Sequence, residues 1–72
     1  MNIGNNKKKL KAKYGKIEAI IEEDLPHVGF YLFIYEYGKG ICDYLQDSVE
    51  ICKEQSFEEF GVPSDSWEEV IE

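Results

Sequence analysis

The sequence contains no arginine, a single histidine, two cysteines and two prolines among its 72 residues. Cys42 and Cys52 are too few for the disulfide framework of a small secreted domain. His27 is the only histidine, and no pair of residues has the short CxxC or HxxxH spacing that brings zinc ligands together, so we expect no metal and no cofactor. The same shortage leaves Cys42 or Ser66 without an evident general base, and we therefore expect no enzymatic activity.

Long hydrophobic runs are also absent. The first ten residues, MNIGNNKKKL, lack the apolar segment of a secretory signal, and no stretch reaches the roughly 20 apolar residues of a membrane-spanning helix. With so few cysteines, this favours a cytoplasmic protein with reduced thiols and no membrane partner. Apolar residues still make up 43% of the chain and aromatic residues 14%, more than a disordered chain contains. We expect a small folded domain with a thin core, to which dimerisation or partner binding would add stability.

Charge is divided unevenly along the chain. Residues 1–16 contain six lysines and no acid, whereas residues 17–72 contain two lysines and all 15 acids, so these parts carry +6 and −13 and the whole chain −7. An acidic body repels phosphate, so nucleic-acid binding would depend on the N-terminal lysines, which lack the planar fork of arginine. The candidate polyanion-binding residues are Lys7, Lys8, Lys9, Lys11 and Lys13. Solubility, disorder or contact with the acidic body are the roles that we favour for them.

The chain divides into a short arm and one domain. Residues 1–9 combine asparagine, glycine and lysine with almost nothing to bury, which predicts a disordered basic arm before a single domain over residues 10–72. From Leu10 to Ile21, apolar and charged residues alternate with a slip of phase at Gly15. This pattern indicates one long strand with a bulge or bend, or two short strands.

A second strand is predicted after the turn EEDLPH. The stretch VGFYLFIYEY, residues 28–37, is apolar on both faces, as in a central strand that is covered on both sides. One helix in so short a chain can cover only one face, so the other must be covered by a second copy, a partner or the tyrosines themselves. The segment YGKG, residues 37–40, predicts a hairpin loop, followed by a short third strand around Ile41 to Tyr44.

The period becomes helical from about Gln46. Asp47 or Ser48 is placed to cap the helix. The side of the helix opposite its apolar stripe is acidic. The apolar stripe consists of Leu45, Val49, Cys52, Ser56 and Phe60, with Phe57 on its flank.

The predicted helix ends at Gly61. A left-handed glycine there would bring Phe57 and Val62 together in a Schellman stop, and Pro63 forbids continuation. Ser66 to Glu69 then has the S-x-x-E pattern of a capping box for a new helical turn. The elements together predict an α+β fold, with a two- to three-stranded antiparallel meander, one amphipathic helix packed on one face and a short C-terminal helical turn.

The segment LQDSVEICKEQSFEEFGVPSDSWEE, which starts at Leu45, resembles the C-terminal helix-and-stop segment of small uncharacterised bacterial proteins. The matching positions are YLQDSVE and FGVPSDSWEE, and the resemblance covers roughly Tyr35 to Glu69. It implies a small domain of unknown function and indicates no active site.

Tyrosines and acids are the candidate contact residues. Five tyrosines lie in predicted strands, where they either form an interface or fill a thin core with their hydroxyls in water. The candidate interface residues are Tyr31, Tyr35, Tyr37, Tyr44, Trp67, Glu50, Glu54 and Glu58. We expect a non-enzymatic protein–protein interaction module, a homodimer, adaptor, inhibitor or immunity-type protein. The alternative is a nucleic-acid-associated regulator that acts through the N-terminal lysine arm.

Overall fold

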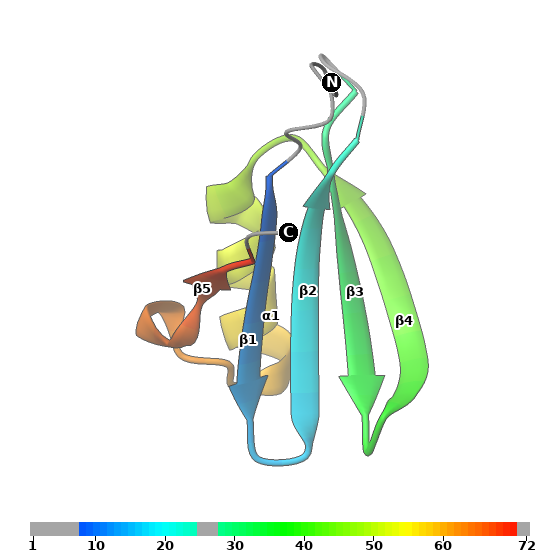
Figure 1. Cartoon of the computed structure of the whole chain (residues 1–72), viewed down its shortest axis with the longest axis vertical. Coiled ribbons are helices and arrows are strands. Elements are labelled where there is room, and N and C mark those ends of the chain that lie inside the picture. The colour runs from blue at the N-terminus through cyan, green and yellow to red at the C-terminus, as the bar shows by residue number, and fades with distance from the viewer. Residues whose placement is uncertain (1–7, 25–27, 71–72) are drawn as a thin grey trace.

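The structure, a computed structural model, describes residues 8–24 and 28–70. In these residues an antiparallel sheet carries one helix on one of its faces (Figure 1). The strands lie in the spatial order β4-β3-β2-β1-β5. The elements are β1 (Lys9–Tyr14), β2 (Ile17–Glu23), β3 (Phe30–Glu36), β4 (Lys39–Gln46), α1 (Val49–Phe60), the 3₁₀ turn η1 (Ser64–Ser66) and β5 (Glu68–Glu69). The α+β class is confirmed, but the sheet has five strands rather than two or three.

The slip of phase at Gly15 is a hairpin turn. Tyr14 pairs with Ile17, so Gly15 and Lys16 form a two-residue loop between β1 and β2. Gly15 has a φ of 61°, which glycine adopts without the steric penalty of a Cβ atom. A bulge or bend within one long strand is therefore wrong, and the alternative of two short strands is confirmed.

The predicted central strand is β3, which lies between β2 and β4. Tyr37 and Gly38 form the loop to β4, and their φ values of 52° and 79° are those of a turn whose twist matches the sheet. β4 extends to Gln46, beyond the predicted third strand. Leu45 therefore pairs with Tyr31 in the sheet instead of joining the helical stripe, because the helix begins only after its cap at Ser48.

The helix begins and ends at the residues that the sequence indicates. Ser48 is the N-cap, and its Oγ accepts a hydrogen bond from the Ile51 N–H at 3.2 Å. Gly61 ends α1 with a φ of 76° and donates its N–H to the Phe57 carbonyl at 2.9 Å. The predicted apolar pair is not formed as expected, because Val62 is fully buried in the core whereas Phe57 is 59% exposed.

The predicted capping box at Ser66 is wrong. The Ser66 hydroxyl donates to the Pro63 carbonyl at 2.7 Å, and η1 ends at this residue instead of starting a new helix there. The chain then extends, so Glu69 pairs with Leu10 in the sheet instead of capping a helix. Pairing with the edge of β1 satisfies backbone groups that a further helical turn would otherwise have satisfied.

The core lies between the sheet and α1. Alternate residues of the strands point toward the helix, and Leu32 and Ile34 of β3 are fully buried. The buried apolar residues are Ala12, Ile17, Ala19, Ile21, Leu32, Ile34, Cys52 and Val62. No helix within residues 8–24 and 28–70 is long and apolar enough to cross a membrane. All packing elements of the described chain thus lie on one side of the sheet (Figure 1).

Candidate interaction face

The sheet face turned away from α1 is not covered by any described element, and Figure 1 looks directly onto it. We call the residues that β1 to β4 place on this side the open face. The open face consists of Lys9, Lys11 and Lys13 of β1, Glu18, Ile20 and Glu22 of β2, Tyr31, Phe33 and Tyr35 of β3, and Gly40, Asp43 and Leu45 of β4.

Strand pairing arranges the open face in rows that run across the strands. The middle row is Lys11, Ile20, Phe33 and Asp43. Its two neighbours are Lys9, Glu22, Tyr31 and Leu45 on one side, and Lys13, Glu18, Tyr35 and Gly40 on the other. Lysines therefore line β1, glutamates flank one isoleucine on β2, and the aromatic side chains lie along β3.

The centre of the open face is apolar. The rings of Tyr31 and Phe33 stack with their centroids 5.8 Å apart, and Phe33 lies opposite Ile20. Leu45 is 49% exposed and Tyr31 36% exposed, while Ile20 and Phe33 are half-buried. The aromatic side chains thus shield one another in part, and a continuous apolar surface remains in contact with water.

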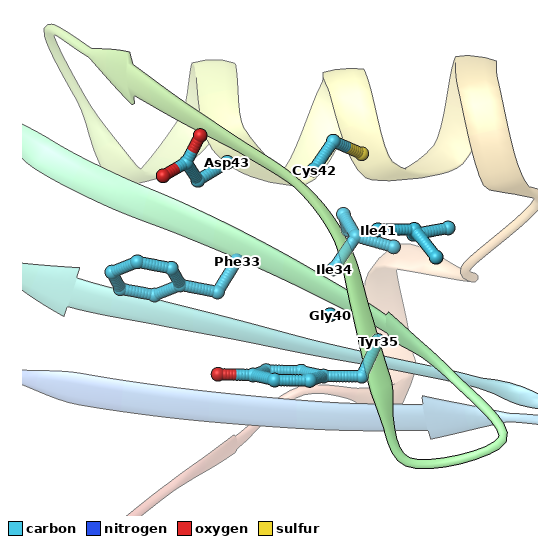
Figure 2. A pocket seen from close by; sticks show the side chains of 7 residues that line it. All are labelled: Phe33, Ile34, Tyr35, Gly40, Ile41, Cys42 and Asp43. Atoms are coloured by element: carbon cyan, nitrogen blue, oxygen red, sulfur yellow. The ribbon is translucent and has the colours of Figure 1, made fainter.

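A shallow hollow of about 300 Å³ lies beside this centre, between β3 and β4. A β-bulge puts Gly40 and Ile41 opposite Tyr35, and Figure 2 shows the Tyr35 and Phe33 side chains along β3 beside them. Gly40 leaves the floor open, since a Cβ atom there would lie 3.6 Å from the Tyr35 ring. Asp43 lines the same hollow. The hollow is therefore lined by apolar and polar groups together, with an acid at its margin.

Most charges of the open face are paired across β1 and β2. Lys9 Nζ lies 3.6 Å from Glu22 Oε2, and Lys11 Nζ lies 3.3 Å from Glu18 Oε2. Such exposed pairs contribute about 0–1 kcal/mol each. Lys13 and Asp43 have no ion pair with any residue in 8–24 or 28–70.

The five candidate aromatic residues do not share one surface. Tyr31 and Tyr35 lie on the open face, and Tyr37 lies in the β3–β4 turn, where it is 83% exposed. Tyr44 and Trp67 lie on the covered side and pack against the core. Of the predicted aromatic interface, only the tyrosines of β3 therefore contribute to the open face.

Tyr44 attaches β4 to the helix. Its hydroxyl donates to Glu59 Oε1 at 3.1 Å, and Gln55 bridges the same carboxylate and Gln46, with bonds of 3.0 Å and 2.7 Å. Hydrogen bonds with Cys42 and Glu59 raise the pKa of Tyr44 to about 12. These contacts give Tyr44 a structural role on the covered side.

The acidic candidates lie on the outer side of α1. Glu50, Glu54 and Glu58 are exposed there beside Phe57, and a hollow of about 390 Å³ separates this part of α1 from Ser64. Within residues 8–24 and 28–70, no three metal-ligating side chains come together. The acidic surface and the open face are therefore two separate sides of the molecule.

The lysine arm is only partly described. Lys7 lies outside the described residues, whereas the Lys8 N–H donates to Glu23 Oε1 at 3.0 Å. β1 begins at Lys9, so the last residue of the predicted arm belongs to the sheet. Lys11 and Lys13 are likewise strand residues on the open face.

The two cysteines are free thiols in different surroundings. Cys52 is fully buried in α1, and burial raises its pKa to about 11. Cys42 is half-buried on the covered side of β4, opposite Ile34.

Comparison with protein-family models, with curated proteins and with solved structures finds no match for this chain. The strand register and the exposure of side chains in this protein are therefore what identify the open face as a candidate site. Sequence reasoning missed Ile20, Asp43 and Leu45 as members of it, and left Phe33 out of the candidate residues although its alternation places it on the same strand face as Tyr31 and Tyr35. The signal that could have found them is their period-2 alternation with the core residues of the same strands.

Proposed function

We propose that this protein is a protein–protein interaction module that binds its partner through the open face of the sheet. The observation that carries the proposal is the apolar row of Ile20 and Phe33, flanked by Tyr31 and Leu45, on a face that no described element covers. Aromatic side chains with charged residues around them are the composition typical of interface centres and rims.

The charges around this centre favour a protein over a nucleic acid as the partner. Lys9 and Lys11 are paired with Glu22 and Glu18, so a phosphate backbone would meet carboxylates beside these ammonium groups. A protein surface with its own acidic and basic groups can satisfy both signs. The regulator that binds nucleic acid through Lys7 and its neighbours therefore remains the second candidate.

Site-specific photocrosslinking in the cells that produce the protein tests the proposal. A photoreactive phenylalanine analogue replaces Phe33 on the open face and, in a matched control, the exposed Phe57 on the outer side of α1. We expect a covalent protein adduct from position 33 that is abolished by Ile20→Asp on the same face. Adducts of equal yield from position 57, or none from position 33, would refute the open face as the binding surface.

A further inference from the structure

Two open-face charges that form no ion pair with a described residue lie on opposite sides of the apolar centre. Lys13 is on β1 and Asp43 is on β4, with β2 and β3 between them. Each has an exposed side chain and no ion pair within residues 8–24 and 28–70. The face thus carries a positive charge at one margin and a negative charge at the other. Two copies of such a face can pair their opposite charges when they meet.

We propose that the open face binds a second copy of this chain, with a twofold axis that runs parallel to the strands between β2 and β3. The proposal rests on the open face being a protein-binding surface, and it names the occupant. This rotation places β1 of each copy over β4 of the other, and it places each row over the same row of the second copy. Ile20 then lies over Phe33 of the second copy, and the Glu18 carboxylate approaches the Tyr35 hydroxyl.

The hollow beside Gly40 fits the side chain that this rotation places over it. Lys13 and Gly40 occupy the same row at the two margins of the face, so the Lys13 of one copy lies over the hollow of the other. A lysine stem can cover the apolar part of the lining while its ammonium group remains near water. Asp43, at the margin of the hollow, is one row away, about 7 Å along the strand and within reach of that ammonium group.

Electrostatics selects this axis over the other face-to-face arrangement. A twofold axis perpendicular to the strands, through the middle row, would place β1 over β1, so Lys11 would meet Lys11 and Lys13 would meet Lys9 of the second copy. Like charges in contact across an interface are unfavourable. The parallel axis instead brings lysines of β1 in each copy close to Asp43 of the other copy, at two equivalent contacts.

The outer edge of β4 is a poorer surface for self-association. Antiparallel pairing of two β4 strands centred on Asp43 would bring the two carboxylates directly opposite each other. The bulge at Gly40 also interrupts the regular backbone pattern that an added strand requires. These are features that protect an edge, and the open face has no such protection.

The area available predicts a weak dimer. Four strands spaced about 4.8 Å apart, each of about seven residues at about 3.3 Å, present roughly 440 Å² per copy in projection. Roughly 900 Å² for both copies falls in the range of transient interfaces. We therefore expect a dissociation constant in the micromolar range or weaker.

Sedimentation velocity over a range of protein concentrations, with charge reversal, tests the geometry. Lys13→Glu and Asp43→Lys should each weaken the dimer about fivefold to thirtyfold, because each change makes both symmetric contacts repulsive. The double variant should regain part of the lost affinity, since its exchanged pair at positions 13 and 43 is attractive again but Lys11, in the row of Asp43, now lies over a lysine. Lys53→Glu on α1 is the matched control for Lys13→Glu, since it changes the net charge by the same amount in the same direction and lies away from the open face.

The outcomes separate this proposal from the proposed function. A dimer that Lys13→Glu weakens no more than Lys53→Glu does, or singles that the double variant fails to rescue, would overturn the stated pairing. A monomer up to millimolar concentration would overturn the second copy as occupant; a Phe33 photoadduct with the mass of a different protein would then leave the proposed function standing. Circular dichroism of each variant confirms that the fold is retained, so loss of the dimer can be assigned to the interface.

Discussion

Replacement of Gly29 by alanine is expected to remove most of the stability of the domain. Gly29 precedes β3 with a φ of 137°, and an ideal Cβ atom there would lie 2.5 Å from the carbonyl oxygen of Gln46 at the end of β4. The backbone oxygen cannot rotate away as a flexible side chain would. The alanine therefore forces either β3 or β4 to move.

The magnitude follows from two separate penalties. A non-glycine residue in so sparsely populated a backbone region costs about 1–3 kcal/mol, and relief of the overlap by shifts of the packed strands costs about 1–3 kcal/mol more. A core of this size supplies about 3–5 kcal/mol in total. We therefore expect Gly29→Ala to be largely unfolded at 25 °C, or to melt at least about 10 °C below the wild type.

Urea unfolding followed by the fluorescence of Trp67, the only tryptophan, measures this effect. Two other glycines act as controls. Gly61→Ala has a positive φ but open space around the new Cβ, so only the backbone penalty applies, whereas Gly40→Ala lacks the positive φ and makes an ordinary contact with Tyr35. The expected urea midpoint is highest for Gly40→Ala, lower for Gly61→Ala and lowest for Gly29→Ala. All samples need one protein concentration, since a dimer would make the midpoint concentration-dependent. Equal midpoints for Gly29→Ala and Gly61→Ala would refute the close approach of Gly29 to β4.

Further changes test other parts of the structure. Gly61→Ala should lower stability by about 1 kcal/mol in the same urea assay, and an unchanged midpoint would contradict the left-handed helix stop. Ser48→Ala should cost about 1 kcal/mol through loss of the cap, with Ser48→Asp as the variant that retains it. A thiol reagent should modify Cys42 before Cys52 in the folded protein; equal rates would argue against burial of Cys52. Burial raises the pKa of Cys52 to about 11 from its usual value of about 9, so the unfolded chain loses this proton at a lower pH than the folded chain. The free energy of unfolding should therefore fall as the pH rises between these two values, and Cys52→Ala should remove this dependence.

Features determined by neighbouring residues could be predicted from the sequence. The cap at Ser48, the stop at Gly61 and the tight turn at Gly38 each depend on interactions over a few positions, and the structure has them where the sequence indicates. The central position of β3 also follows from its own composition, because both of its faces are apolar. Such local patterns were sufficient for the class of the fold.

The first hairpin shows where the pattern is ambiguous. A bulge at Gly15 and a two-residue hairpin loop both shift the alternation by one residue, because Tyr14 pairs with Ile17 across the loop. The sequence pattern therefore cannot distinguish a bent strand from two paired strands. The predicted number of strands was too low because of this turn and because of β5. Glu68 and Glu69 have no strand pattern in the sequence, and they pair with β1 only because η1 brings them to it.

The candidate site was predicted only in part, because residue type was given more weight than strand parity. Tyr31 and Tyr35 alternate with the buried Leu32 and Ile34, and therefore lie on the open face. Tyr44 lies on the covered side because the bulge after Gly40 resets the alternation in β4. A bulge depends on the pairing of two strands, which the sequence of one strand does not specify.

The size of the covering elements explains why one face of the sheet remains open. A helix of 12 residues is about 18 Å long and about 10 Å wide, whereas five strands at about 4.8 Å span roughly 24 Å. Even the covered face therefore requires Val62 and Trp67 from the segment after α1 to complete its packing. The described chain has no further element for the opposite side, where Phe33 and Leu45 remain against water. A strand that is apolar on both faces, in a domain whose described elements cover only one of them, is the feature that supports our proposal of a second protein surface over the open face.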